Sequence, residues 1–148
     1  MKRAVTLSLL LASIFQVSAA LADDPIPSGQ EIQSKAEQNT TIIDTATLRK
    51  RLNEEPDLIL IDIRTKHEID RMGGTISVPQ NTNIPRGWIE FRIQSLAPEK
   101  NTPLVVYCGA GLRSPLAAET LQQMGYTNVR NYSEGYLGWK KSQTQKSE

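Results

Sequence analysis

Short apolar runs alternate along the chain with segments in which apolar residues recur every three or four positions. The runs at residues 58–61 and 103–107 are almost continuously apolar, which is typical of parallel strands that are covered on both faces. Shorter segments at residues 41–43, 75–78 and 129–132 predict further strands. The pattern therefore predicts a sheet of five strands, counted from these segments.

The segments between these strands carry helical signals. Asp44 is placed to cap a helix that has Leu48 and Leu52 on one face and ends at residues 54–56. Further helices are expected at residues 65–71, 86–96, 114–124 and 135–141, and Gly125 is expected to close the third of these at a C′ position. Alternating strands and helices indicate an α/β fold, a three-layer domain over residues 41–141 with a mainly parallel, five-stranded sheet flanked by helices.

The two ends of the chain differ from this domain. Lys2 and Arg3 precede an uncharged stretch at residues 4–18, and Ala20-Leu21-Ala22 follows, which predicts a signal peptide over residues 1–22 that is cut after Ala22. The uncharged stretch is short against the roughly 20 residues of a membrane-spanning helix, so no stable membrane anchor is expected after cleavage. Residues 23–40 read as a polar linker or arm with a short helix at 30–37, and residues 142–148 as a tail. We expect a periplasmic or secreted protein.

Charge and cysteine content narrow the chemistry. The chain has 17 basic and 16 acidic residues, and loss of Lys2 and Arg3 leaves 15 against 16, a net charge of −1. Such a balance gives no reason to expect a nucleic-acid partner. The single cysteine cannot form an intramolecular disulfide, and no metal site is expected.

That cysteine, Cys108, follows an apolar strand and opens a glycine-rich loop that leads into a helix. Ligands of open parallel sheets bind at this edge, beyond the carboxyl ends of the strands. Gly109 and Gly111 permit the positive φ values and the close backbone approach that such a loop requires, so that backbone N–H groups surround the sulfur, with Arg113 as a nearby cation. This environment favours a thiolate or a bound anion. The alternative is a buried structural cysteine.

Three segments, in order, resemble a single-domain rhodanese over residues 58–141. Residues 60–64 with Glu68 are similar to the family's D-x-R…E segment, residues 108–114 to its C-x-x-G-x-R-S loop, and residues 134–140 to its closing glycine-tryptophan segment. The resemblance implies a rhodanese-like fold and a sulfurtransferase without a cofactor. Cys108 would attack a donor such as thiosulfate and carry the sulfur as a persulfide to cyanide, a thiol or a protein thiol.

The same resemblance assigns the remaining site residues. The donor anion would bind the loop residues Gly109, Ala110, Gly111, Leu112, Arg113 and Ser114. Asp62 and Arg64 would support the loop, with an internal ion pair as the favoured role. The chain departs from the family at residues 70–75, where the usual histidine and proline are missing, and at Gly109-Ala110, which leaves anion recognition to Arg113 and the backbone.

Two other classes of protein remain as alternatives. Cysteine phosphatases and arsenate reductases have a similar fold but a longer C-x-x-x-x-x-R loop, whereas four residues separate Cys108 from Arg113. A non-catalytic module for partner binding or redox relay is the other, although such modules typically lack the cysteine. His67 is expected to face solvent or cap a helix, and Trp139 is expected to pack in the core. Trp88 and Phe91 are candidates to line the pocket, although core packing is the usual role of aromatic residues at helical spacing.

Overall fold

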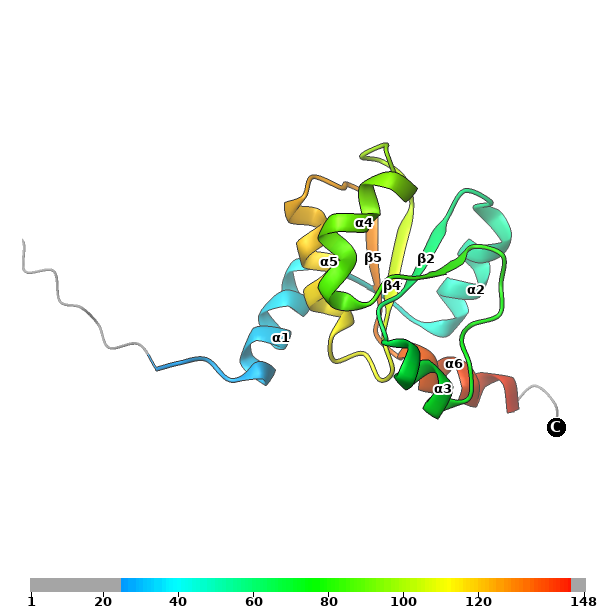
Figure 1. The fold of residues 1–148 in the computed structure, drawn as a ribbon, viewed down its shortest axis with the longest axis horizontal. Helices are drawn as coiled ribbons and strands as arrows, with labels where there is room; N and C mark the ends of the chain where they lie inside the picture. Colours follow the sequence, from blue (N-terminus) through cyan, green and yellow to red (C-terminus); the bar gives the residue numbers. More distant parts are fainter. Residues whose placement is uncertain (1–24, 145–148) are drawn as a thin grey trace, which may run out of the picture.

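The structure is a computed structural model that describes residues 25–144. Its centre is a sheet of five parallel strands in the order β1-β5-β4-β2-β3. Figure 1 shows β5, β4 and β2 side by side in this order. The strands are β1 (Thr41–Ile43), β2 (Ile59–Asp62), β3 (Asn81–Asn83), β4 (Leu104–Tyr107) and β5 (Val129–Tyr132). The expected three-layer α/β architecture is confirmed.

The two central strands show why their sequences are apolar throughout. Leu60 of β2 and Val105 of β4 point into one core, whereas Ile61 and Val106 point into the other. Both faces of the sheet are therefore buried at β2 and β4, and each fully buried aliphatic side chain contributes roughly 1.5–3 kcal/mol.

Helices cover both faces of the sheet. They are α1 (Gly29–Asn39), α2 (Thr45–Glu54), α3 (Lys66–Met72), α4 (Ile89–Leu96), α5 (Ser114–Gln123) and α6 (Gly135–Thr144). One core lies against α4 and α5, and the other lies against α2 and α6. Figure 1 shows α4 and α5 on one side of the strands and α2 on the other.

Local signals in the sequence account for the helix ends. Asp44 caps α2 by accepting a hydrogen bond from the Thr47 N–H at 2.8 Å, as expected. Gly125 follows α5 with φ +98°, which confirms its position after the helix end. The short helix expected at residues 30–37 is α1, which packs beside α5 (Figure 1) and buries Ala36 completely.

One predicted strand was wrong. Residues 75–78 form no strand, and the polar segment β3 pairs with Leu60–Asp62 at the edge of the sheet instead. Thr75 does not pair as part of a strand. Its hydroxyl donates a hydrogen bond to the Asp62 carboxylate at 3.0 Å and lies 2.7 Å from the Tyr107 hydroxyl. An edge strand is open to solvent on one side, so it tolerates the polar residues that apolar patterning overlooks.

The outward face of α4 also differs from expectation. The segment begins with a 3₁₀ turn (Arg86–Trp88) and continues as α4. Ile89 and Ile93, one turn apart, occupy the buried face, which leaves Trp88 at 52% and Phe91 at 79% exposure. Leu96 and Met124 are exposed as well. The prediction of core packing is therefore wrong for Trp88 and Phe91.

The predicted signal peptide lies outside the described residues, as does the end of the predicted tail, whose first residues, 142–144, continue α6. Between residues 25 and 144, no helix is long and apolar enough to cross a membrane.

Candidate active site

Cys108 immediately follows β4 at the carboxyl edge of the sheet, and α5 begins at Ser114. Its side chain is 1% exposed, and its Sγ lies 3.9 Å from the Oγ of the buried Ser114. Ala110 and Leu112, in contrast, face solvent. The loop therefore carries its sulfur inward, beside the start of a ten-residue helix whose dipole favours negative charge there.

The backbone of the loop offers hydrogen-bond donors. Within residues 25–144, the N–H groups of residues 109–113 donate to no carbonyl or side-chain oxygen. Free N–H groups in a tight loop are the basis of anion-binding nests. This backbone can therefore bind an anion without any polar side chain on Gly109 or Ala110.

The two loop glycines serve different purposes. Gly111 has φ +80°, and a Cβ atom there would collide with the Ser133 carbonyl oxygen. Gly109 is not among the glycines of the described chain with positive φ, so of the two expected roles only close approach applies to it. A Cβ on Gly109 would instead lie 3.2 Å from the Cε of Met72, so close packing against α3 is what favours glycine there.

The first turn of α6 fixes the backbone of the cysteine loop through two hydrogen bonds. The Tyr136 N–H donates to the Cys108 carbonyl at 2.8 Å, and the Leu137 N–H donates to the Gly109 carbonyl at 3.0 Å. Gly135 has φ +60°, and a Cβ there would lie 2.7 Å from the Cys108 oxygen. The sequence of the loop itself gives no sign of these contacts, whereas the glycine-tryptophan segment at residues 134–140 contains the residues that make them.

Arg113 does not stand alone as a cation. Its Nη1 donates to Oε2 of Glu68 at 3.2 Å, and its Nη2 pairs with Oε1 of the same carboxylate. Arg113 and a hydrogen bond from the Thr65 N–H lower the pKa of Glu68 to about 2. Hydrogen bonding to Glu68 raises the pKa of Arg113, and Cys108 adds a smaller interaction in the same direction. The guanidinium is thus shared between Glu68 and the surroundings of the thiol.

Asp62 and Arg64 form the internal ion pair that the sequence predicts. Both side chains are completely buried, and Arg64 Nε donates to Asp62 Oδ1 at 2.9 Å. The guanidinium also stacks on the Tyr136 ring at 4.2 Å and contacts the Met72 sulfur at 3.5 Å. Since Met72 packs on Gly109 and the Tyr136 N–H bonds the Cys108 carbonyl, the pair supports the loop through these two residues.

The segment at residues 70–75, where the family's histidine and proline are missing, is fixed by other contacts. Gly73 ends α3 in the left-handed region with φ +87°. Its carbonyl accepts from the Tyr136 hydroxyl at 3.1 Å, and the Gly74 carbonyl accepts from Arg64 Nη2 at 3.0 Å. The segment is therefore tied to the same buried pair that supports the cysteine loop.

Other candidate residues lie outside this arrangement. His67 is exposed on α3, and Trp139 of α6 packs in the core that α6 shares with α2, as expected for each. No group of three His, Cys, Asp or Glu side chains between residues 25 and 144 could hold a metal ion.

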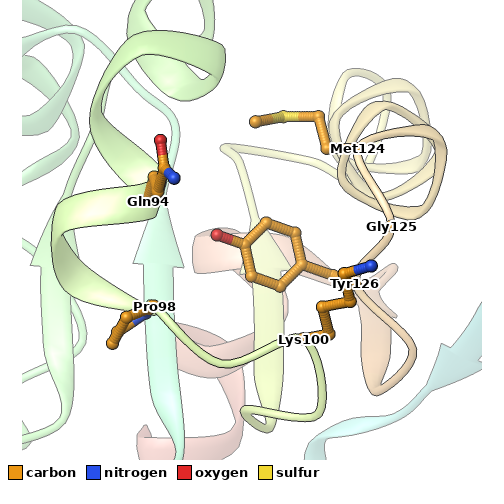
Figure 2. Close-up of a pocket in the computed structure, with 6 residues that line it drawn as sticks. All are labelled: Gln94, Pro98, Lys100, Met124, Gly125 and Tyr126. Atoms are coloured by element: carbon orange, nitrogen blue, oxygen red, sulfur yellow. The ribbon is translucent and has the colours of Figure 1, made fainter.

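A cavity of about 240 Å³ lies elsewhere in the molecule. It is lined by Gln94, Pro98, Lys100, Met124, Gly125 and Tyr126 (Figure 2). Lys100 and Tyr126 precede β4 and β5, so this cavity lies at the amino edge of the sheet. It is therefore separate from the Cys108 loop.

The fold and loop define a class of α/β domain with a cysteine at the carboxyl edge of a parallel sheet. The model of the rhodanese-like domain family matches residues 44–142, and the chain belongs to that family.

Named relatives of the chain transfer sulfur. It is 34% identical over 97 residues to a sulfurtransferase of Allochromatium vinosum, covering 66% of this chain and 85% of that protein. It is 38% identical over 73 residues to the thiosulfate sulfurtransferase PspE of Escherichia coli, covering 48% of this chain and 64% of PspE. The polysulfide-sulfur transferase homodimer of Wolinella succinogenes has a similar structure, with a TM-score of 0.67 and 27% identity over 76% of this chain and 81% of that one.

Proposed function

We propose that this protein is a sulfurtransferase that carries sulfur on Cys108. The observation that carries the proposal is the position of the only cysteine, in a loop of free backbone N–H groups at the start of α5. The helix start and Arg113 favour a thiolate or a bound anion at that place. The named sulfurtransferase relatives support the same reaction type.

The first step loads the cysteine. An electron pair of the Cys108 thiolate forms a bond to the outer sulfur of thiosulfate, and the S–S bond of thiosulfate breaks with its electron pair leaving on sulfite. Cys108 then holds the transferred sulfur as a persulfide anion. The N–H groups of residues 109–113 stabilise negative sulfur in this step, which is where preorganised donors contribute most.

The second step unloads the cysteine. A thiophile such as cyanide attacks the outer sulfur of the persulfide, the S–S bond breaks, and the electron pair returns to Cys108 as thiolate. Cyanide leaves as thiocyanate, whereas a thiol or a protein thiol leaves as a new persulfide. Because Cys108 is 1% exposed, either acceptor has to approach a sulfur that lies almost entirely inside its loop.

Thiocyanate production tests the proposal. The purified protein is mixed with thiosulfate and cyanide, and the rate is compared with that of a Cys108→Ser variant whose circular dichroism matches the parent. We expect turnover by the parent and only the uncatalysed rate from the variant. Equal rates would rule out Cys108 as the sulfur carrier. Hydrolysis of an aryl phosphate without thiocyanate formation would favour the phosphatase alternative, and sulfur loading without turnover would favour a relay module.

We also propose that the mature protein works in the periplasm or outside the cell. The support is the pattern at Lys2, Arg3 and residues 4–22. Intact mass of the exported protein tests it, and the expected mature chain begins at Asp23. Recovery of full-length protein from the cytosol alone would contradict it.

A further inference from the structure

We infer that Glu68 determines donor specificity, because its carboxylate occupies the Arg113 guanidinium that an anionic sulfur donor needs. The inference rests on the proposed function and says which donors that function prefers. A donor with little negative charge is accepted readily, whereas a dianion is disfavoured by the carboxylate that already stands there.

The geometry makes Glu68 a competitor and not a distant neighbour. Each carboxylate oxygen of Glu68 pairs with one terminal nitrogen of Arg113. This bidentate arrangement is the strongest that a guanidinium offers to an anion, and Glu68 already occupies it. The two side chains remain 42% and 33% exposed, so the pair lies within reach of a ligand from solvent. An incoming anion has to displace Glu68 or bind beside an ion pair of zero net charge.

The carboxylate is held in place by its own helix. Oε2 of Glu68 accepts hydrogen bonds from the Thr65 N–H at 2.9 Å and the Thr65 hydroxyl at 3.0 Å, in a capping box at the start of α3. These bonds do not depend on Arg113, so Glu68 keeps its position when Arg113 turns towards a ligand. Its pKa of about 2 keeps it ionised at working pH.

No other cation on the loop offsets this carboxylate. Arg113 is the one basic residue between Cys108 and Ser114. Arg64, which supports the loop through Met72 and Tyr136, forms a buried ion pair with Asp62, so its charge is neutralised. Gly109 and Ala110 add only backbone donors. The balance of charge around the sulfur is therefore set by Arg113 and Glu68 together, and removal of Glu68 would expose one full positive charge to the donor.

Two sulfur donors of similar shape but different charge separate the effect of donor charge on binding from the effect of donor shape. Thiosulfate is a dianion, and methanethiosulfonate replaces one of its oxyanions by a methyl group. In both reactions the Cys108 thiolate bonds to the outer sulfur, and the S–S bond electrons leave on sulfite or on methanesulfinate. If each unit of donor charge changes binding about threefold, Glu68→Gln lowers the KM about tenfold for thiosulfate and about threefold for methanethiosulfonate.

Matched variants complete the test. Glutamine preserves a capping box, so Glu68→Gln removes the charge and keeps the cap. Glu31→Gln is the control, because Glu31 forms the same capping box with Ser28 at the start of α1. Glu31 is exposed, and its hydrogen bonds involve no arginine. The control should leave both KM values unchanged. If Glu68→Gln fails to fold by circular dichroism, Glu68→Ala carries the same prediction.

The outcomes are distinguishable. A fall in KM that is larger for thiosulfate, and that shrinks at high salt, is the expected result. Unchanged KM values in the variant, an equal fall for both donors, or a rise for both would overturn the inference, and a rise would make Glu68 a residue that only orients Arg113. If the parent is loaded by neither donor, the proposed function itself fails.

Discussion

Replacement of Gly135 by alanine tests whether the first turn of α6 holds the cysteine loop. Gly135 has φ +60°, a conformation that costs an L-residue about 1–2 kcal/mol. The new Cβ would lie 2.7 Å from the Cys108 oxygen and 2.8 Å from the Gly109 oxygen, so the loop backbone has to move. That movement breaks one or both of the bonds from the Tyr136 and Leu137 N–H groups, at about 1 kcal/mol each.

These contributions together predict a loss of about 2–4 kcal/mol in the free energy of unfolding. With a urea m-value of about 1–3 kcal/mol/M, this loss lowers the urea midpoint by about 0.7–4 M. Sulfur transfer should fall as well, under conditions where the variant is still folded, because the Cys108 carbonyl has lost its anchor.

Gly29→Ala is the matched control. Gly29 opens α1, and nothing lies within 4 Å of the position its Cβ would take. Alanine there should leave the urea midpoint unchanged or raise it slightly. If Gly135→Ala unfolds at the same urea concentration as the parent and transfers sulfur at the same rate, the first turn of α6 does not hold the cysteine loop in place.

Two further predictions concern the ion pairs. The pKa of Glu68 lies at about 2 in the folded protein and near 4.5 without its partners, so the pair stabilises the fold fully above about pH 4.5 and this stabilisation is lost as the pH falls towards 2. Because the pair is partly exposed, its contribution to the free energy of unfolding is about 1 kcal/mol or less. Urea titrations between pH 7 and pH 2 should show that the free energy of unfolding of Glu68→Gln depends less on pH than that of the parent. Parallel curves for the two proteins would contradict the assignment. Arg64→Met leaves the buried Asp62 carboxylate unpaired, which should cost about 3–5 kcal/mol in urea unfolding at pH 7, and a change below 1 kcal/mol would mean that Asp62 finds another partner.

The sequence predicted those parts of the fold that local pattern controls. The apolar runs of β2 and β4 and the cap at Asp44 were visible because burial and capping leave marks within a few residues. The strand β3 was missed because Asn81–Asn83 is a polar edge segment, whose pairing depends on its neighbour β2. Trp88 was misplaced because Ile89 and Ile93 define the inward face of that helix.

The candidate site divides in the same way. The position of Cys108 after a strand and before a helix follows from the order of elements alone. The pairing of Glu68 with Arg113 joins residues 45 positions apart, and no periodicity in the sequence relates them. Gly135 likewise reaches Cys108 only because β5 lies beside β4 in the sheet. Contacts of this kind come from topology, which sequence spacing does not encode.

Mapping of the transferred sulfur tests the central claim most directly. The protein is incubated with thiosulfate, freed of excess reagent, alkylated to trap persulfides and digested for peptide mass spectrometry. The account predicts one added sulfur atom on the peptide that contains Cys108, which disappears when cyanide is added before alkylation. A Cys108 peptide that gains no sulfur, while the protein still produces thiocyanate, would contradict it.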